Sequence, residues 1–147
     1  MPIKKSLTTC SILSVLLLAW TSASAEVNSV FISSTLDPNA IIITEVDIIF
    51  IYDEEIAATL PATKSDWYSS KRQFTQAAGE RMDIVNVFIP QGFDSEMASL
   101  PERRGEALKV VVYAYHDDSK APPRDISDMS DALIQIDPFG IRLSERP

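Results

Sequence analysis

The only histidine of the chain, His116, is followed directly by two acids, Asp117 and Asp118. An imidazole beside carboxylates can form a general base or a metal site, because a carboxylate can orient the ring or share the ion. Adjacent residues on a strand point to opposite faces, so His116 and Asp117 can aim at one ion only if a turn lies between them. The sequence therefore favours a histidine at a strand end beside a solvated acidic loop. A small exported hydrolase or metal-dependent enzyme that uses His116 and the nearby acids stays open as the alternative.

Two further groups of acids have spacings that carboxylate chemistry could use. Asp125, Asp128 and Asp131 recur at every third position, which would place them on one face of a helix. A calcium loop needs alternate ligands, a central glycine and a closing glutamate, which this segment lacks, so we expect a capped helical turn. Asp53-Glu54-Glu55 offers the paired carboxylates of glycosidases, but acids at a helix start are more typical of dipole stabilisation. The sequence predicts no catalytic residue, metal or cofactor.

Tyrosines near the histidine indicate a different role, which is binding of a protein partner. Tyr113 and Tyr115 share one face of a predicted strand, and tyrosine is enriched among the residues that dominate binding energies. The alternative is that this face belongs to the core. The predicted partner-binding residues are these two tyrosines and four acids that follow them: Tyr113, Tyr115, Asp117, Asp118, Asp125 and Asp128.

The elements that position these residues are predicted to be mainly strands. Residues 40–52 give the strongest signal because they are rich in β-branched side chains. Within them Glu45 and Asp47 share one face, which we expect to be solvated in the middle of the strand. Five other segments have strand character, namely residues 27–33, 83–89, 107–116, 132–136 and 141–143.

The two predicted helices lie between the second and third of these strands. Residues 53–60 start with acids and end before Pro61, and a second helix is predicted from Ser65, with Ser65-Asp66 as its cap, to Gly79. One helical excursion among strands with short turns does not make alternating βαβ units. The sequence predicts a mainly β protein, an antiparallel β-sandwich with a helical insertion after the second strand.

The N-terminus has the three zones of a cleavable export signal. Lys4 and Lys5 are followed by an apolar run from Ile12 to Trp20 and then by small residues that end at Ala23-Ser24-Ala25. The run is shorter than the ~20 residues that a membrane span needs. Cys10 precedes the apolar run, so we interpret it as part of the signal and not as a lipid attachment site. We predict cleavage after Ala25, a single periplasmic domain at residues 26–147, and no direct membrane insertion of that domain.

The composition of the predicted mature domain excludes several classes of function. Removing 25 residues from 147 leaves 122, enough for one hydrophobic core. The signal carries two lysines and no acids, so the net charge changes from −8 to −10. This charge disfavours nucleic acids and anionic lipid surfaces. Without Cys10 the domain has no cysteine, which excludes disulfides, thiol catalysis and cysteine–zinc sites, and a fold without disulfides fits a bacterial periplasm.

The order of these segments resembles a known family. Ile48-Ile49-Phe50-Ile51-Tyr52 precedes an acid-started helical piece, a later strand ends in Ile89-Pro90-Gln91-Gly92, and Leu100-Pro101 is followed by the strand Lys109-Val110-Val111-Val112-Tyr113-Ala114-Tyr115. This pattern spans most of residues 41–143 and is similar to that of the TssJ family, the small outer-membrane lipoproteins of type VI secretion systems.

The resemblance implies a transthyretin-like β-sandwich with an added helical piece. It also implies an exported binding or assembly module whose partner is the periplasmic part of the secretion machine's inner-membrane anchor protein. Members of the family are held to the outer membrane through an acylated N-terminal cysteine, which the predicted mature chain lacks. The resemblance therefore implies a soluble or accessory relative. By position, residues 117–131 are the loop predicted to meet the partner.

Overall fold

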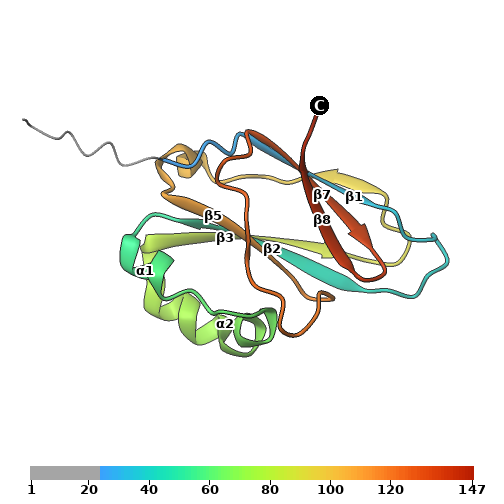
Figure 1. The fold of residues 1–147 in the computed structure, drawn as a ribbon, viewed down its shortest axis with the longest axis horizontal. Helices are drawn as coiled ribbons and strands as arrows, with labels where there is room; N and C mark the ends of the chain where they lie inside the picture. Colours follow the sequence, from blue (N-terminus) through green and yellow to red (C-terminus); the bar gives the residue numbers. More distant parts are fainter. Residues whose placement is uncertain (1–23) are drawn as a thin grey trace, which may run out of the picture.

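In the computed structural model, which describes residues 24–147, two four-stranded sheets pack face to face and two helices lie outside one of them (Figure 1). The sheets have the strand orders β4-β1-β7-β8 and β3-β2-β5-β6. The strands are β1 Ser29–Ser34, β2 Thr44–Ile51, β3 Met82–Ile89, β4 Ser95–Met97, β5 Lys109–Ala114, β6 Arg124–Asp125, β7 Asp131–Asp137 and β8 Gly140–Glu145. The helices are α1 Glu54–Ala58 and α2 Lys64–Ala78, with 3₁₀ turns at Gly79–Arg81 and Glu102–Glu106. The predicted β-sandwich with a helical insertion after its second strand is confirmed.

The central strand of the helix-covered sheet is β2, which pairs antiparallel with β3 on one side and with β5 on the other. Val46, Ile48 and Phe50 point into the interior between the two sheets, whereas Ile49 and Ile51 point toward the helices. The β-branched segment is therefore buried on both faces over its second half, as a run without polar residues predicts.

The other sheet contains a parallel pair, which the purely antiparallel prediction did not include. Strand β1 lies parallel to β7, with Ser29 opposite Asp131 and Ser34 opposite Ile136. Parallel neighbours need a long connection, and here almost the whole domain lies between the two strands. The first strand of the domain is thereby fixed between β4 and β7, which ties the N-terminal part of the fold to its C-terminal part.

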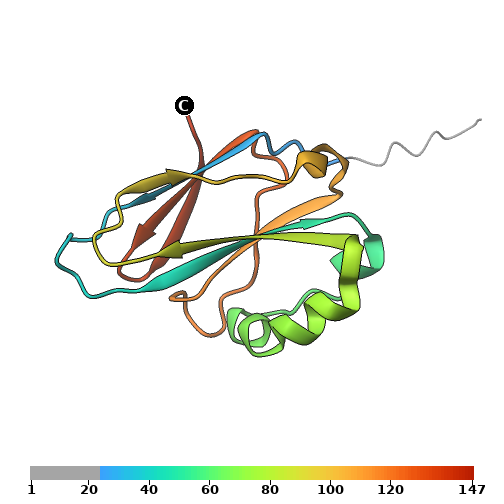
Figure 2. The same ribbon diagram turned by 180° about the vertical axis from the view of Figure 1, so that it is seen from behind.

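The helical insertion covers the outer face of the β3-β2-β5-β6 sheet, as the view from behind in Figure 2 also shows. Helix α1 is capped by Asp53, whose carboxylate accepts the N–H of Ile56. Helix α2 begins at Lys64 with Thr63 as its cap, so the predicted cap at Ser65-Asp66 is wrong by two residues. It ends at Gly79, whose φ of 55° is the left-handed conformation that favours glycine at a helix end.

Residues 117–131 differ from the open loop with a helical turn that the sequence predicted. Asp125 lies in strand β6, Asp131 begins β7, and Asp128 lies in a turn between them. The three acids therefore do not share a helix face. The reason is local, because the Asp125 carboxylate accepts the N–H of Ser127 and the Ser127 hydroxyl accepts the N–H of Val110 on β5.

The predicted export signal lies outside the described residues except for its last two, Ser24 and Ala25. Ala25 is buried, and its N–H donates to the carbonyl oxygen of Ala107 at 2.7 Å. Cleavage after Ala25 would therefore remove this contact from the folded domain, and the cleavage point stays a prediction. Within residues 24–147 no helix has the length and hydropathy that a membrane span requires.

Candidate functional site

His116 lies in the turn that follows β5, and not on the strand that was predicted to contain it. Its Nδ1 is 3.1 Å from the hydroxyl of Thr44, and its Nε2 is 3.0 and 2.9 Å from the carbonyl oxygens of Asp137 and Gly140. Because carbonyl oxygens only accept hydrogen bonds, Nε2 carries a proton and donates it. Both ring nitrogens are used to join β2 and the end of β5 to the β7–β8 turn.

The same turn lets Asp117 face that hairpin as well. Its Oδ1 accepts the N–H of Ile141 at 3.1 Å, and burial raises the pKa of its carboxyl, an effect that the guanidinium of Arg124 and the Ile141 N–H oppose. The carboxylate also fills the space beside Gly140, where a Cβ would overlap it and where φ is +149°. His116 and Asp117 therefore hold the β7–β8 turn in place.

These contacts bear on the enzyme alternative. Among residues 24–147 no three histidine, cysteine, aspartate or glutamate side chains lie close enough together to hold a metal ion. His116 has no free ring nitrogen with which to act as a base or a ligand. Asp118 is exposed and accepts the N–H of Lys120 in a local turn. The arrangement supports a structural role for the histidine and its acidic neighbours.

Tyr113 and Tyr115 share one face, as predicted, but only Tyr115 reaches the surface. Tyr113 is 1% exposed, because α2 covers it and the ring of Trp67 stacks on it at a centroid distance of 5.0 Å. Its hydroxyl donates to the carbonyl oxygen of Pro61, and burial raises its pKa. Its side chain is thus core and cannot contact a partner directly. Tyr115 is 53% exposed and meets Tyr68 edge to face.

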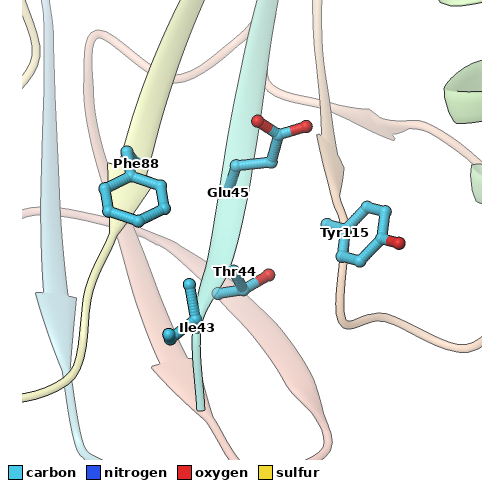
Figure 3. Close-up of a pocket in the computed structure, with 5 residues that line it drawn as sticks. All are labelled: Ile43, Thr44, Glu45, Phe88 and Tyr115. Atoms are coloured by element: carbon cyan, nitrogen blue, oxygen red, sulfur yellow. The ribbon is translucent and has the colours of Figure 1, made fainter.

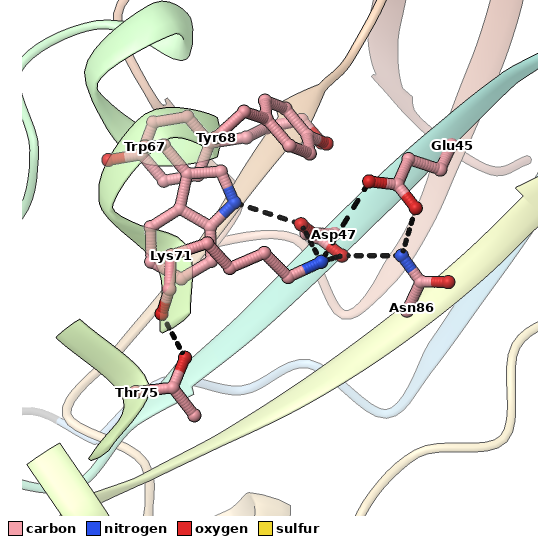
Figure 4. Close-up of polar contacts among 8 residues, drawn as sticks. Glu45, Asp47, Trp67, Tyr68, Lys71, Thr75 and Asn86 are labelled. Carbon is pink, nitrogen blue, oxygen red and sulfur yellow. Dashed lines mark hydrogen bonds and ion pairs between the residues drawn. The ribbon is translucent and has the colours of Figure 1, made fainter. Parts of the chain in front are cut away.

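Beside these rings, α2 covers a charged residue that the sequence placed in solvent. Asp47 is completely buried, and its carboxylate accepts hydrogen bonds from Trp67 Nε1 at 2.9 Å, Asn86 Nδ2 at 2.7 Å and Lys71 Nζ at 3.0 Å (Figure 4). Three donors from two elements satisfy the charge that burial would otherwise penalise. The network fixes α2 across β2 and β3.

The network continues toward the uncovered part of the sheet. Glu45 accepts a hydrogen bond from Asn86 at 3.0 Å and lies 3.9 Å from the ammonium group of Lys71. Burial, and then the charges of Asp47 and Glu45, raise the pKa of Tyr68 well above its usual value, so this tyrosine stays neutral. On β2 the polar network therefore ends at Glu45, and beyond it Ile43 and Phe88 are exposed.

Apolar side chains occupy this uncovered end. Phe88, Glu45 and Tyr115 lie in a row, since Glu45 is opposite Phe88 and its carbonyl accepts the N–H of Tyr115 at 2.9 Å. Together with Ile43 and Thr44 they line a shallow hollow of about 190 Å³ (Figure 3). Ile43, directly before β2, and Phe88 on β3 are 61% and 58% exposed, which is unusual for large hydrophobic residues at the edge of a core.

Two more exposed hydrophobic residues belong to the same end of the sandwich. Ile41 precedes β2 and is 83% exposed, and Phe139 at the tip of the β7–β8 turn is 88% exposed. Of the six large hydrophobic side chains exposed in the described part of the chain, only Met97 lies elsewhere. We define the loop-end patch as the other five: Ile41, Ile43, Phe88, Tyr115 and Phe139.

The predicted partner-binding acids do not form one surface with this patch. Asp117 is buried, and Asp118 is exposed close to Tyr115 in the chain. Asp125 pairs in register with Val111, near the opposite end of β5, and Asp128 lies in the turn after it. The acids are therefore divided between the two ends of the sandwich.

Sequence reasoning missed four residues of the loop-end patch. Phe139 follows Asp137-Pro138 in a hairpin turn, where a side chain has little to pack on, and that position alone could have indicated exposure. Phe88 shares a strand face with Asn86, which could have indicated that this face is open. Ile41 and Ile43 belong to a run of isoleucines, and no signal in the run separates exposed from buried members.

The sequence matches no protein-family model and no curated protein. Among solved structures, the type VI secretion lipoprotein TssJ1 from Pseudomonas aeruginosa matches over 81% of this chain and 95% of its own, with 8% identity and a TM-score of 0.51. Lip of Serratia marcescens, a membrane-bound component of the type VI secretion system, matches over 81% of this chain and 96% of its own, with 12% identity and a TM-score of 0.49.

The chain thus has the β-sandwich fold of TssJ1, and the likeness extends over nearly all of that protein. The resemblance predicted from the order of segments is confirmed at the level of the fold.

Proposed function

We propose that this chain is an exported, TssJ-like component or accessory of a type VI secretion system, and that it works by binding a protein partner. The observation that carries the proposal is the fold, which matches TssJ1 over 95% of that protein's length. The loop-end patch supports it, because five exposed hydrophobic residues gathered at one end of a small domain are typical of a protein interface.

The loop-end patch has the composition of a binding surface. Tyrosine and phenylalanine supply large, rigid contact areas, and in the proposed complex Tyr115 and Phe139 are the aromatic anchors. Tyr115 is already oriented by Tyr68 and by Lys64, whose ammonium group lies 5.3 Å from its ring centre. Asp118 contributes an acidic rim beside it. A surface that is ordered before binding loses little conformational entropy on association.

The proposed partner is the periplasmic part of the machine's inner-membrane anchor protein, as the family resemblance implies. This requires export, which rests on the signal pattern of residues 1–25. Intact mass measurement of the protein from a periplasmic extract should give a chain that begins at Glu26. A chain that keeps its first 25 residues, or one found only in the cytosol, would contradict the proposed location.

A co-purification experiment tests the binding. The tagged protein should retain the purified periplasmic region of the anchor protein, and the double variant Ile41→Ser/Phe139→Ser should lose it while keeping its circular dichroism spectrum. Met97→Ser is the matched control, because Met97 is a comparably exposed hydrophobic residue outside the patch.

A second pair of variants asks which end of the sandwich is used. Asp125→Ala/Asp128→Ala changes two acids at the opposite end and should leave binding unchanged if the loop-end patch is the interface. Loss of binding in this variant alone would contradict the loop-end assignment, and no retention by the unchanged protein would contradict the proposed partner.

A further inference from the structure

Strand β3 is an outer strand of its sheet, and it presents unpaired backbone groups to solvent. The Glu45 carbonyl accepts the N–H of Tyr115, so the backbone N–H and C=O groups of the odd-numbered residues of β2 face β5. Those of the even-numbered residues of β2 face β3. Val46 is opposite Val87, so the odd-numbered residues of β3 bond to β2. The N–H and C=O groups of β3 that point away from the sheet are those of its even-numbered residues, Met82, Ile84, Asn86 and Phe88.

This edge lacks the features that usually keep sheet edges apart. β3 has eight residues in unbroken register with β2, with no proline, lysine or bulge, and its single charge, Asp83, is bound by Arg103 at 2.9 Å. The other outer strands of the described domain are short or charged, since β4 has three residues, β6 has two, and β8 carries Arg142 and Glu145. An open, weakly charged edge of this length is suited to pair with another strand.

A groove runs beside the edge, between β3 and α2. It has a volume of about 650 Å³ and is open to solvent, with Ile84 and the ring of Tyr68 among its apolar walls. Phe88, two residues from Asn86 on the same strand face, is 58% exposed and has no cover of its own. In Figure 2 β3 crosses the near side of the molecule, and no other element lies over it.

We propose that two copies of this chain form a two-fold symmetric dimer through antiparallel pairing of their β3 strands, centred on Asn86. In this register Asn86 faces its symmetry mate and Ile84 faces Phe88 of the other copy. Each of the three pairs exchanges two hydrogen bonds, about six in all. Each Phe88 ring then lies beside the other copy's Ile84, where the groove opens.

The neighbouring registers fit less well. In a register centred on Val87 in place of Asn86, Pro90 lies opposite Ile84, and proline has no N–H to donate. In a register centred on Val85, Phe88 lies opposite Met82, whose side chain is already buried in its own subunit, and Ile84 lies opposite the polar Asn86. Pairing about a two-fold axis uses both free edges, so the assembly closes as a dimer and does not extend into a fibre.

The dimer goes beyond the proposed function and is tested without any partner protein. Sedimentation equilibrium of the purified domain, over roughly a hundredfold range of concentration, should give a mass that rises to twice that of the monomer. Phe88→Lys and Phe88→Pro should both give a monomer, because the first adds a charge at the pairing edge and the second removes an outward N–H without removing a bond to β2. Met97→Lys, on the short outer strand β4, is the matched control and should still dimerise.

Cysteine cross-linking tests the register in a Cys10→Ser background, since Cys10 is the only native cysteine. Asn86→Cys should form an interchain disulfide on mild oxidation, because residues directly opposite in such a pair have Cα atoms about 5.5 Å apart. Phe88→Cys should not, because its two copies lie about 14 Å apart along the strands. A protein that stays monomeric at every concentration, a dimer that Phe88→Lys and Phe88→Pro leave unchanged, or cross-linking at 88 and not at 86 would each overturn the proposal.

Discussion

The ion pair between Lys71 and Asp47 gives the sharpest prediction about stability. Lys71 Nζ is 2.8 Å from Asp47 Oδ2, and the Asp47 side chain is fully buried whereas that of Lys71 is 29% exposed. Removing one partner of a fully buried pair costs about 3–5 kcal/mol. In Lys71→Met the Asp47 carboxylate keeps its hydrogen bonds from Trp67 and Asn86, and position 71 is partly open to water. The loss should therefore be smaller than for a fully buried pair, and we expect the free energy of unfolding to fall by about 2 kcal/mol.

A double-mutant cycle separates this ion pair from the packing of α2. In Asp47→Asn the new amide N–H₂ must face donor groups only, so this variant should also lose about 2 kcal/mol. In the double variant neither an unpaired carboxylate nor an amide facing an ammonium group remains. Its loss should therefore be smaller than the sum of the two single losses by about 1 kcal/mol or more.

Urea unfolding followed by fluorescence measures these values, since Trp67 is the only tryptophan in residues 26–147 and bonds directly to Asp47. Arg72→Met is the matched control, because Arg72 is the next residue of α2, is exposed, and should change stability by less than about 0.5 kcal/mol. Equal losses of stability in Lys71→Met and Arg72→Met would refute the reasoning. So would a double variant whose loss equals the sum of the losses in Asp47→Asn and Lys71→Met.

Three further predictions concern acids and a glycine. The Arg103 guanidinium, and then the Tyr52 hydroxyl, hold the pKa of Asp83 below its usual value. The contribution of Asp83 to stability is therefore lost as pH falls through that lowered pKa. Asp83→Asn should flatten the decline of the urea midpoint between about pH 5 and pH 2. Burial raises the pKa of Asp117, so its contribution is present at low pH and is lost as pH rises through the raised value. Asp117→Asn keeps an acceptor for Ile141 and should be at least as stable as the unchanged protein at neutral pH, whereas Asp117→Ala should lose about 1–2 kcal/mol in the same assay. Gly140→Ala should cost about 2–4 kcal/mol in thermal unfolding, because its φ is +149° and the new Cβ would meet the Asp117 carboxylate; an unchanged midpoint would contradict this.

The sequence predicts the parts of this fold that local patterns determine. The β-branched run at residues 40–52 gives β2, because a pleated strand accommodates branched side chains on both buried faces. Gly79 ends α2 in the left-handed conformation, which glycine adopts without strain. The shared face of Tyr113 and Tyr115 follows from the two-residue period of a strand.

Contacts between distant segments were not predictable in this way. Asp47 looked solvated because alternation places it on the face of Glu45, and only the position of α2 reveals that Lys71 and Trp67 cover it. His116 looked like a candidate base because its partners, the carbonyls of Asp137 and Gly140, carry no sequence signal. Backbone acceptors are present at every residue, so composition cannot indicate which of them a histidine will use.

The central claim is that the loop-end patch binds the periplasmic region of a type VI secretion anchor protein. Isothermal titration of that purified region into the purified domain tests it most directly. We expect saturable binding at a defined stoichiometry that is weakened at least tenfold, about 1.4 kcal/mol, in Phe139→Ser. No binding by the unchanged domain, or equal affinity in the variant, would contradict the claim.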